Sequence, residues 1–282
     1  MDLSKGGRKI NSIENWFEIA PPKGRERHWQ DGRSAKECAK AWLETGRPAL
    51  PVELRDLFDS NEHTQGFDPL EVEPEAQIKF DKRSGEPCNA DLAILGSIRL
   101  SHIGCTIEAK VNEHFGKLLP DELCSSLERW RKSNRSRKLN RIKDLVQSIL
   151  PAHSSSLPLL TEIRYQLLTA VAGTLAWANW LHCCQAVLVI HEFRTLQSTP
   201  NRIAANAADL NNFVRRLTNN LVSSVPDGEM LGPFQVPGTP LFNNPPPLFI
   251  GKAVRHLASA DDINSASVAI PAHDCTRSMM LD

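Results

Sequence analysis

The chain has 282 residues, a length that suits one domain of about 200 to 250 residues with additional terminal segments. Hydrophobic residues make up 41% of the chain and charged residues 23%, which excludes a wholly disordered or fibrous protein. Lys plus Arg and Asp plus Glu number 33 each, and this balance, taken as a total, argues against a protein that coats nucleic acid or an acidic membrane.

The first third of the chain predicts an arm followed by two helices. Pro21, Pro22 and Gly24 interrupt any regular element near the start, so we expect a loose N-terminal arm over residues 1–33. From residue 35 the apolar side chains recur at helical spacing, at positions 35, 38, 39, 42 and 43. Pro51 suits the first position of a second, short helix over residues 51–58.

Three strands are predicted next. Apolar and polar residues alternate over residues 70–81, which is the period of a half-buried strand. Turn-forming residues follow at 82–85, and a second strand over 89–95 would complete a hairpin. Residues 103–111 form the third strand.

The second half alternates between helices and strands. Residues 165–190 contain no Asp, Glu, Lys or Arg, but their preferences change from helix formers to β-branched residues, which favours a buried helix and strand over a membrane span. The predicted elements are a basic helix over 121–150, an apolar helix over 159–183, a strand over 186–193, a helix over 206–217 and an edge strand over 248–254. We expect one α/β domain over 34–256 and a disordered tail over 257–282.

Acidic and basic side chains gather on the second and third strands. Glu108 and Lys110 are two residues apart, so they project from the same face of their strand. Asp91 lies among apolar residues of the preceding strand, where a carboxylate is costly unless something binds it. If the strands pair, Asp91 and Glu108 converge into an oxygen site that suits Mg²⁺, and Lys110 can orient or deprotonate a water.

The order of these elements resembles a known superfamily of nucleases. Residues 105–111, Cys-Thr-Ile-Glu-Ala-Lys-Val, with Ala90-Asp91-Leu92 before them, resemble the signature of the PD-(D/E)xK (restriction-endonuclease-like) superfamily. The whole chain also resembles an uncharacterised bacterial family within it, and residues 164–168 resemble the helix start of RecB-type members, where a Gln points to the cleft. Ala90 replaces the usual Pro, and Ala170 stands where the RecB-type members have Tyr, so the subgroup stays open.

The resemblance implies a central mixed sheet flanked by helices and Mg²⁺- or Mn²⁺-dependent hydrolysis of phosphodiester bonds. It implies that Asp91 and Glu108 are metal ligands, that Lys110 is the catalytic lysine and that Gln166 lies at the catalytic site. A further acidic ligand is expected from an early element. Glu75, on the polar face of the hairpin, is the preferred candidate over Glu37 and Glu44, which we expect to be solvated.

Structural alternatives stay open for these residues. Asp91 could accept backbone hydrogen bonds at a strand end, Glu108 and Lys110 could form an ordinary same-face ion pair, and Gln166 could be an ordinary helix residue. Glu192 could lie near the active end of the sheet.

A basic segment is the second notable feature. Residues 128–143 contain eight basic side chains against one acidic, whereas residues 51–91 contain eleven acidic against four basic. The neutral total therefore hides a charge separation, which is compatible with a nucleic-acid partner or with a plain surface dipole. The candidate nucleic-acid contacts are Arg129, Trp130, Arg131, Lys132, Arg135, Arg137, Lys138 and Arg141. Trp130 could stack on a base or anchor the helix to the core.

These observations favour a metal-dependent nuclease that acts on DNA, with a catalytically inactive nuclease-fold domain that binds nucleic acid or a protein partner as the alternative. A homodimer is one possible assembly, because concerted cutting of both strands needs two sites. Seven cysteines without CxxC pairs indicate neither a disulfide framework nor a zinc site, and the N-terminus lacks the apolar stretch of a signal peptide. We therefore expect a cytoplasmic protein.

Overall fold

The computed structural model describes residues 1–83, 85–133, 137–152, 157–195 and 198–257. Within these residues, eight strands form one mixed sheet in the order β2-β1-β3-β4-β5-β6-β8-β7. The strands are β1 (Asp2–Lys5), β2 (Arg8–Lys9), β3 (Asp68–Ile78), β4 (Cys88–Ile98), β5 (Ser101–Lys110), β6 (Gln185–Arg194), β7 (Met230–Phe234) and β8 (Leu248–His256). The pairs β3–β4 and β4–β5 are antiparallel, whereas β5–β6 and β6–β8 are parallel.

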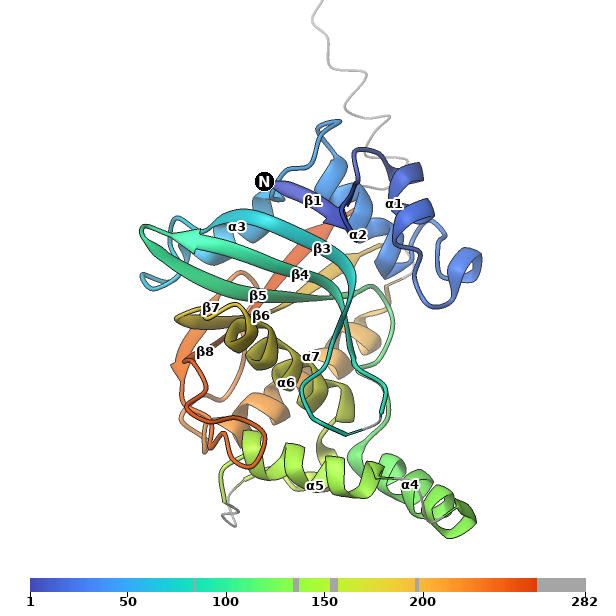
Figure 1. Ribbon diagram of the computed structural model, residues 1–282, viewed down its shortest axis with the longest axis vertical. Helices are drawn as coiled ribbons and strands as arrows, with labels where there is room; N and C mark the ends of the chain where they lie inside the picture. The colour runs from blue at the N-terminus through green and yellow to red at the C-terminus, as the bar shows by residue number, and fades with distance from the viewer. Residues whose placement is uncertain (84, 134–136, 153–156, 196–197, 258–282) are drawn as a thin grey trace, which may run out of the picture.

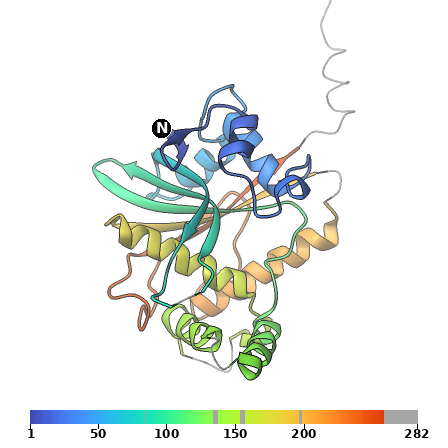
Figure 2. The same cartoon turned by 45° about the vertical axis from the view of Figure 1, so that its right-hand side comes forward.

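Helices cover both faces of the sheet (Figures 1 and 2). The α-helices are α1 (Ile13–Ile19), α2 (Ser34–Leu43), α3 (Val52–Asp59), α4 (Leu119–Ser133), α5 (Lys138–Ile149), α6 (Tyr165–Trp180) and α7 (Pro200–Leu217), with 3-10 turns at Arg25–Arg27 and Leu160–Glu162. Helix α2 contacts β5 and α3 contacts β8 on one face, and α6 crosses β4, β5 and β6 on the other. The expected α/β class, a mixed sheet flanked by helices, is confirmed.

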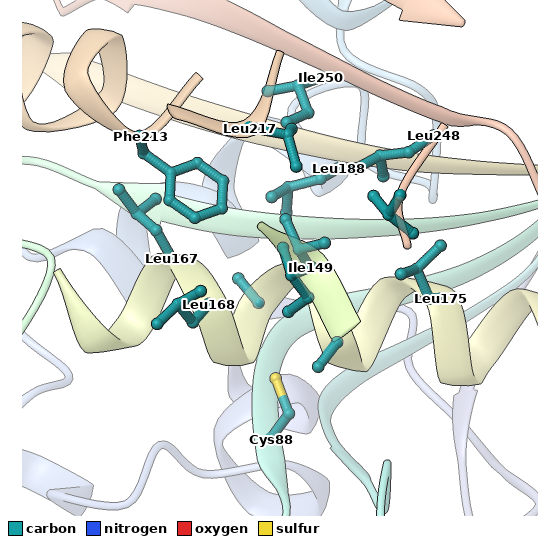
Figure 3. Close-up of a cluster of buried hydrophobic side chains, with 14 of the residues drawn as sticks. Cys88, Ile149, Leu167, Leu168, Leu175, Leu188, Phe213, Leu217, Leu248 and Ile250 are labelled. Carbon is teal, nitrogen blue, oxygen red and sulfur yellow. The ribbon is translucent and has the colours of Figure 1, made fainter. Parts of the chain in front are cut away.

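Each face of the sheet has its own apolar core. On the α6 face, Leu167 and Leu175 of α6 pack with Phe213 of α7 and Leu188 of β6 (Figure 3). Helix α6 lies very close to β5, because a Cβ atom at Gly104 would stand 2.6 Å from the Cα atom of Ala178. The glycine therefore permits the contact that holds α6 against the central strands.

Most predicted elements are present near their expected positions. The apolar positions of α2 are buried as expected, including Trp42 at 0% exposure. The three strands predicted in the first half of the chain are β3, β4 and β5, which pair in sequence as an antiparallel meander. The predicted hairpin joins β3 to β4. Local periodicity was enough to predict these elements.

The N-terminal segment differs from the predicted loose arm. Strand β1 pairs with β3 in parallel, and Leu3, Ile10 and Trp16 are buried in the core on the α2 face. Four residues of strand carry too little periodicity to be read from sequence, and the partner strand lies more than sixty residues away. Of the predicted tail over 257–282, Leu257 donates its amide to the Arg194 carbonyl at 2.9 Å, and residues 258–282 lie outside the described residues.

Four other elements were predicted with wrong bounds or position, and one of them is the helix predicted over 206–217, which spans Pro200–Leu217 as α7. The basic helix over 121–150 is two helices, α4 and α5, and the apolar helix begins at Tyr165 rather than at residue 159. Strand β8 is not an edge strand, because β7 pairs with its outer side. Among the described residues, no helix combines the length and the apolar character needed to cross a bilayer.

Candidate active site

Three carboxylates lie in one row across the meander. The register pairs Leu92 of β4 with Ile107 of β5, which places Asp91 opposite Glu108. On the other side, Pro74 pairs with Leu92 and Ala76 with Ala90, which places Glu75 opposite Asp91. Directly opposed residues in a sheet have Cβ atoms about 4.5–5.5 Å apart. The fold thus brings together the three acidic residues that the sequence proposed as metal ligands.

Glu75 occupies an unusual backbone position in this row. Its φ angle is 51°, in the left-handed region that residues other than glycine rarely adopt. Its carbonyl oxygen accepts a hydrogen bond from Lys5 Nζ at 2.7 Å, and the same ammonium group donates to the Pro74 carbonyl at 3.0 Å. Strand β1 therefore helps to hold the strained residue in place, a situation common at functional sites.

Lys110 and Gln166 complete the cluster around Glu108. The side chains of Glu108 and Lys110 are each nearly buried, and Lys110 Nζ lies 2.7 Å from Glu108 Oε1. Gln166, in the first turn of α6, donates its side-chain amide to Glu108 and accepts from Lys110 Nζ at 3.4 Å. The helix packed on the central strands thus fixes the rotamers of both residues of the Glu-x-Lys pair.

Burial and mutual repulsion perturb the carboxylates. Burial raises the pKa of Glu75 to about 7, with the Lys5 charge opposing the shift and the Glu108 charge adding to it. Burial, assisted by the charges of Glu108 and Glu75, raises the pKa of Asp91 well above its usual range. Burial alone would lower the pKa of Lys110, but Glu108 and Asp91 reverse this effect and keep its amine charged. Burial and repulsion therefore favour the protonated forms of Glu75 and Asp91, and a bound cation would favour their ionised forms.

The chemistry of the donor set suits a hard divalent cation, because all three candidate ligands supply carboxylate oxygens. The spacing of these three carboxylates in the structure is less suitable for binding such a cation. Asp91 Oδ2 already accepts a hydrogen bond from the Ala109 amide at 2.7 Å. In the described parts of the chain, no three His, Cys, Asp or Glu residues are grouped so that they could hold a metal ion. Binding would therefore require the carboxylates of Glu75, Asp91 and Glu108 to converge further.

A cavity of about 530 Å³ opens beside this cluster, and Glu108 and Gln166 line part of its wall. The opposite wall comes from the basic helix pair. Four of the predicted nucleic-acid contacts line the cavity, namely Arg129, Arg137, Lys138 and Arg141. Trp130, Arg131 and Lys132 are exposed on α4 and do not line it, and Arg135 lies outside the described residues. The tertiary structure thus brings four of the eight predicted nucleic-acid contacts next to the proposed catalytic residues.

Three of these four basic residues have partners within the protein, and Arg129 Nη2 lies 3.7 Å from Glu122 Oε1. Arg141 Nε lies 2.6 Å from Asp81 Oδ2, and its Nη1 donates to the Glu86 carbonyl at 2.6 Å. Lys138 forms an ion pair with Glu122 and lies 5.1 Å from the centre of the Tyr165 ring. Arg141 therefore holds the loop of the β3–β4 hairpin, which in Figure 1 reaches towards α5.

The sequence did not single out three other residues of the cavity wall. Lys117 follows β5, Arg83 lies in the hairpin loop, and Tyr165 precedes Gln166 on α6. Arg83 was interpreted only as a turn residue. What they share is their position in the sequence, because each lies within eight residues of a proposed catalytic residue.

The other acidic candidates lie elsewhere. Glu37 is 3% exposed and accepts hydrogen bonds from the Gly32 amide and from Lys40, so the prediction that it is solvated was wrong. Glu44 is exposed and pairs with Arg255. Glu192 stands beside Lys110 in the register, but its carboxylate pairs with Arg194 at 2.7 Å and lies 3.7 Å from Lys252 Nζ.

Comparisons with known proteins give a family but no activity. No curated protein and no solved structure matches the chain. One family model, described as a domain of unknown function (DUF6946), matches residues 9–244, a span that includes the carboxylate row, Gln166 and the basic helices. The chain therefore belongs to the DUF6946 family.

Proposed function

We propose that this protein is a metal-dependent nuclease of the PD-(D/E)xK type that hydrolyses phosphodiester bonds, with DNA as the first candidate substrate. The observation that carries the proposal is the shared cavity. Glu108 and Gln166 line one side, and Arg129, Arg137 and other basic residues line the other. An acidic cluster that would hold a divalent cation once its carboxylates converge, next to cations that can hold phosphates, suits a phosphodiester substrate.

The order of the elements supports the same proposal. The resemblance implies a helix, three strands, a helix and a further strand, and the chain has α2, β3 to β5, α6 and β6 in that order. Asp91 lies on the second of the three strands, and Glu108 and Lys110 lie on the third. The parallel pairing of β5 with β6 gives the mixed sheet that the resemblance implies.

The chain's own residues have distinct tasks in this reaction. Glu75, Asp91 and Glu108 would hold a Mg²⁺ or Mn²⁺ ion, which when bound lowers the pKa of a coordinated water and polarises the phosphate. Lys110, charged and buried, would orient the attacking water and stabilise the charge that grows on the phosphate oxygens. Gln166 holds Glu108 and Lys110 in position through its side-chain amide.

The test compares the purified protein with three variants on plasmid, linear double-stranded and single-stranded DNA, with and without Mg²⁺ or Mn²⁺. Glu108→Gln and Lys110→Met should lower the cleavage rate by at least about 100-fold, while Glu71→Gln, a matched change at an exposed position of β3, should leave it unchanged. Cleavage by Glu108→Gln at the rate of the unmodified protein would refute the assignment.

A second candidate is a catalytically inactive domain that binds nucleic acid. One observation favours it: Asp91, Glu108, Lys110 and Gln166 already satisfy one another or the backbone through hydrogen bonds. Titration calorimetry with Mn²⁺ separates the two candidates. A heat of binding that Glu108→Gln removes supports the nuclease, whereas no binding together with retained affinity for oligonucleotides supports the inactive domain.

A further inference from the structure

The cavity beside the carboxylate row is too narrow for a double helix. Its volume of about 530 Å³ equals that of a sphere about 10 Å across, whereas the two backbones of B-DNA are separated by a major groove about 12 Å wide, so both strands cannot enter it together. Pockets of about 300–1,000 Å³ enclose one drug-sized molecule, which corresponds to one or two nucleotides. We infer that the site takes a single-stranded segment of nucleic acid, an inference that rests on the proposed nuclease function.

The walls of the cavity are fixed in a way that keeps it narrow. Arg141 binds Asp81 through two nitrogen atoms and also holds the Glu86 carbonyl, so α5 is fastened to both ends of the hairpin loop. Arg83, in the same loop, forms an ion pair with Asp144 of α5. Bidentate Arg–carboxylate pairs that are largely shielded from water are rigid and specific. The loop and helix are therefore fastened to each other in the cavity wall, which resists the widening that a duplex would require.

Two cations of the cavity wall remain available for phosphates. Four of the wall cations, Arg83, Arg129, Lys138 and Arg141, each pair with an acidic side chain inside the protein. In contrast, Lys117 and Arg137 are exposed and form no ion pair within the described residues; the ammonium group of Lys117 lies 3.4 Å from the Ser125 hydroxyl. They stand on two different segments of the wall, one after β5 and one at the start of α5. This arrangement suits successive phosphates of one strand that leads to Glu108.

The first test measures binding without cleavage. Fluorescence anisotropy of labelled 12-nucleotide DNA and RNA of one sequence, single-stranded and as blunt duplexes, is recorded in Ca²⁺ over a range of salt concentrations. We expect single strands to bind at least tenfold more tightly than duplexes. Lys117→Gln and Arg137→Gln should each weaken single-strand binding several-fold and lower the slope of log K against log salt by about 0.7. Lys143→Gln is the matched control, because Lys143 lies on α5, is exposed and does not line this cavity.

The second test measures the cleavage of the same four substrates in Mg²⁺ or Mn²⁺. A rate on single strands at least tenfold above the rate on duplexes supports the inference, and the DNA and RNA substrates identify which nucleic acid is preferred. Equal or faster cleavage of the duplex overturns the inference but leaves the nuclease function intact. If no substrate is cleaved, the nuclease function is refuted, and the binding data alone decide whether the site takes a single strand. Equal single-strand affinities of the Arg137→Gln and Lys143→Gln variants would then overturn the inference.

Discussion

Glu53 of α3 forms a buried ionic contact that should dominate the acid stability of the protein. Its Oε1 atom lies 2.8 Å from His191 Nε2 on β6 and 2.7 Å from Arg255 Nε on β8, and Arg255 Nη2 lies 3.0 Å from Oε2. Burial opposes ionisation, but the hydrogen bonds from His191 and Arg255 lower the pKa of Glu53 to about 2 from 4.5. Burial also lowers the pKa of His191, so the neutral imidazole donates from Nε2.

The sign and size of the effect follow from this pKa. Because the folded-state pKa lies below the unfolded value, the ionised carboxylate adds stability that is complete above pH 4.5 and is lost as the pH falls towards 2. The difference between the two pKa values corresponds to about 3 kcal/mol of unfolding free energy. Glu53→Gln should therefore destabilise the protein by about 3 kcal/mol at pH 7, and the loss should shrink as the pH falls from 4.5 to 2.

Urea denaturation at a series of pH values measures this loss of unfolding free energy. The loss is read from the shift of the urea midpoint, which requires that the denaturant slope m is the same for the two proteins. The control is Glu44→Gln, because Glu44 also contacts Arg255 but is 63% exposed, and an exposed pair contributes at most about 1 kcal/mol. A loss below about 1 kcal/mol for Glu53→Gln at pH 7, or a loss that is the same at pH 7 and pH 2, would show that the contact does not stabilise the fold in the way argued.

Three further predictions concern α6 and its contact with the sheet. Gln166→Ala should lower the cleavage rate about 10- to 100-fold in a steady-state assay, because residues that orient catalytic groups contribute on that scale. An unchanged rate would show that Gln166 has no role in cleavage. Gly104→Ala should lower the unfolding free energy by about 1–3 kcal/mol in thermal denaturation, because the new Cβ atom meets the backbone of Ala178. Gly251→Ala should lower the unfolding free energy by less, because its new Cβ atom meets only the ends of side chains. Leu175→Ala, at a position with 0% exposure, should cost about 2–5 kcal/mol by urea denaturation, and a smaller loss would indicate that the core collapses around the gap.

The candidate site could be predicted in part because its signals are local. Glu108 and Lys110 share a face by strand geometry alone, and Asp91 was notable because a carboxylate among apolar residues needs a reason. Alternation along β3 placed Glu75 on the polar side of its strand. The register then brought these positions into one row.

Other parts could not be predicted because they depend on contacts between distant segments. Leu3 is buried through a strand partner more than sixty residues away, and the outer position of β7 follows from its pairing with β8. Glu37 looked solvated because it lies opposite the apolar face of α2, but the segment that precedes the helix folds back and donates the Gly32 amide to it. Helical periodicity describes one face of an element and does not predict which loop covers the other.

The sequence by itself determined the alternation of helices and strands, the acidic residues of the meander and the density of positive charge in residues 128–143. These are properties of neighbouring residues, set by backbone periodicity and side-chain chemistry. Only the tertiary structure decided which basic side chains face the carboxylates. Arg141 binds the hairpin loop, Arg137 lines the cavity, and Arg131 lies on the exposed surface of α4. The packing of α5 against the hairpin and α6 orients the first two, and the packing of α4 against α5 leaves Arg131 in solvent.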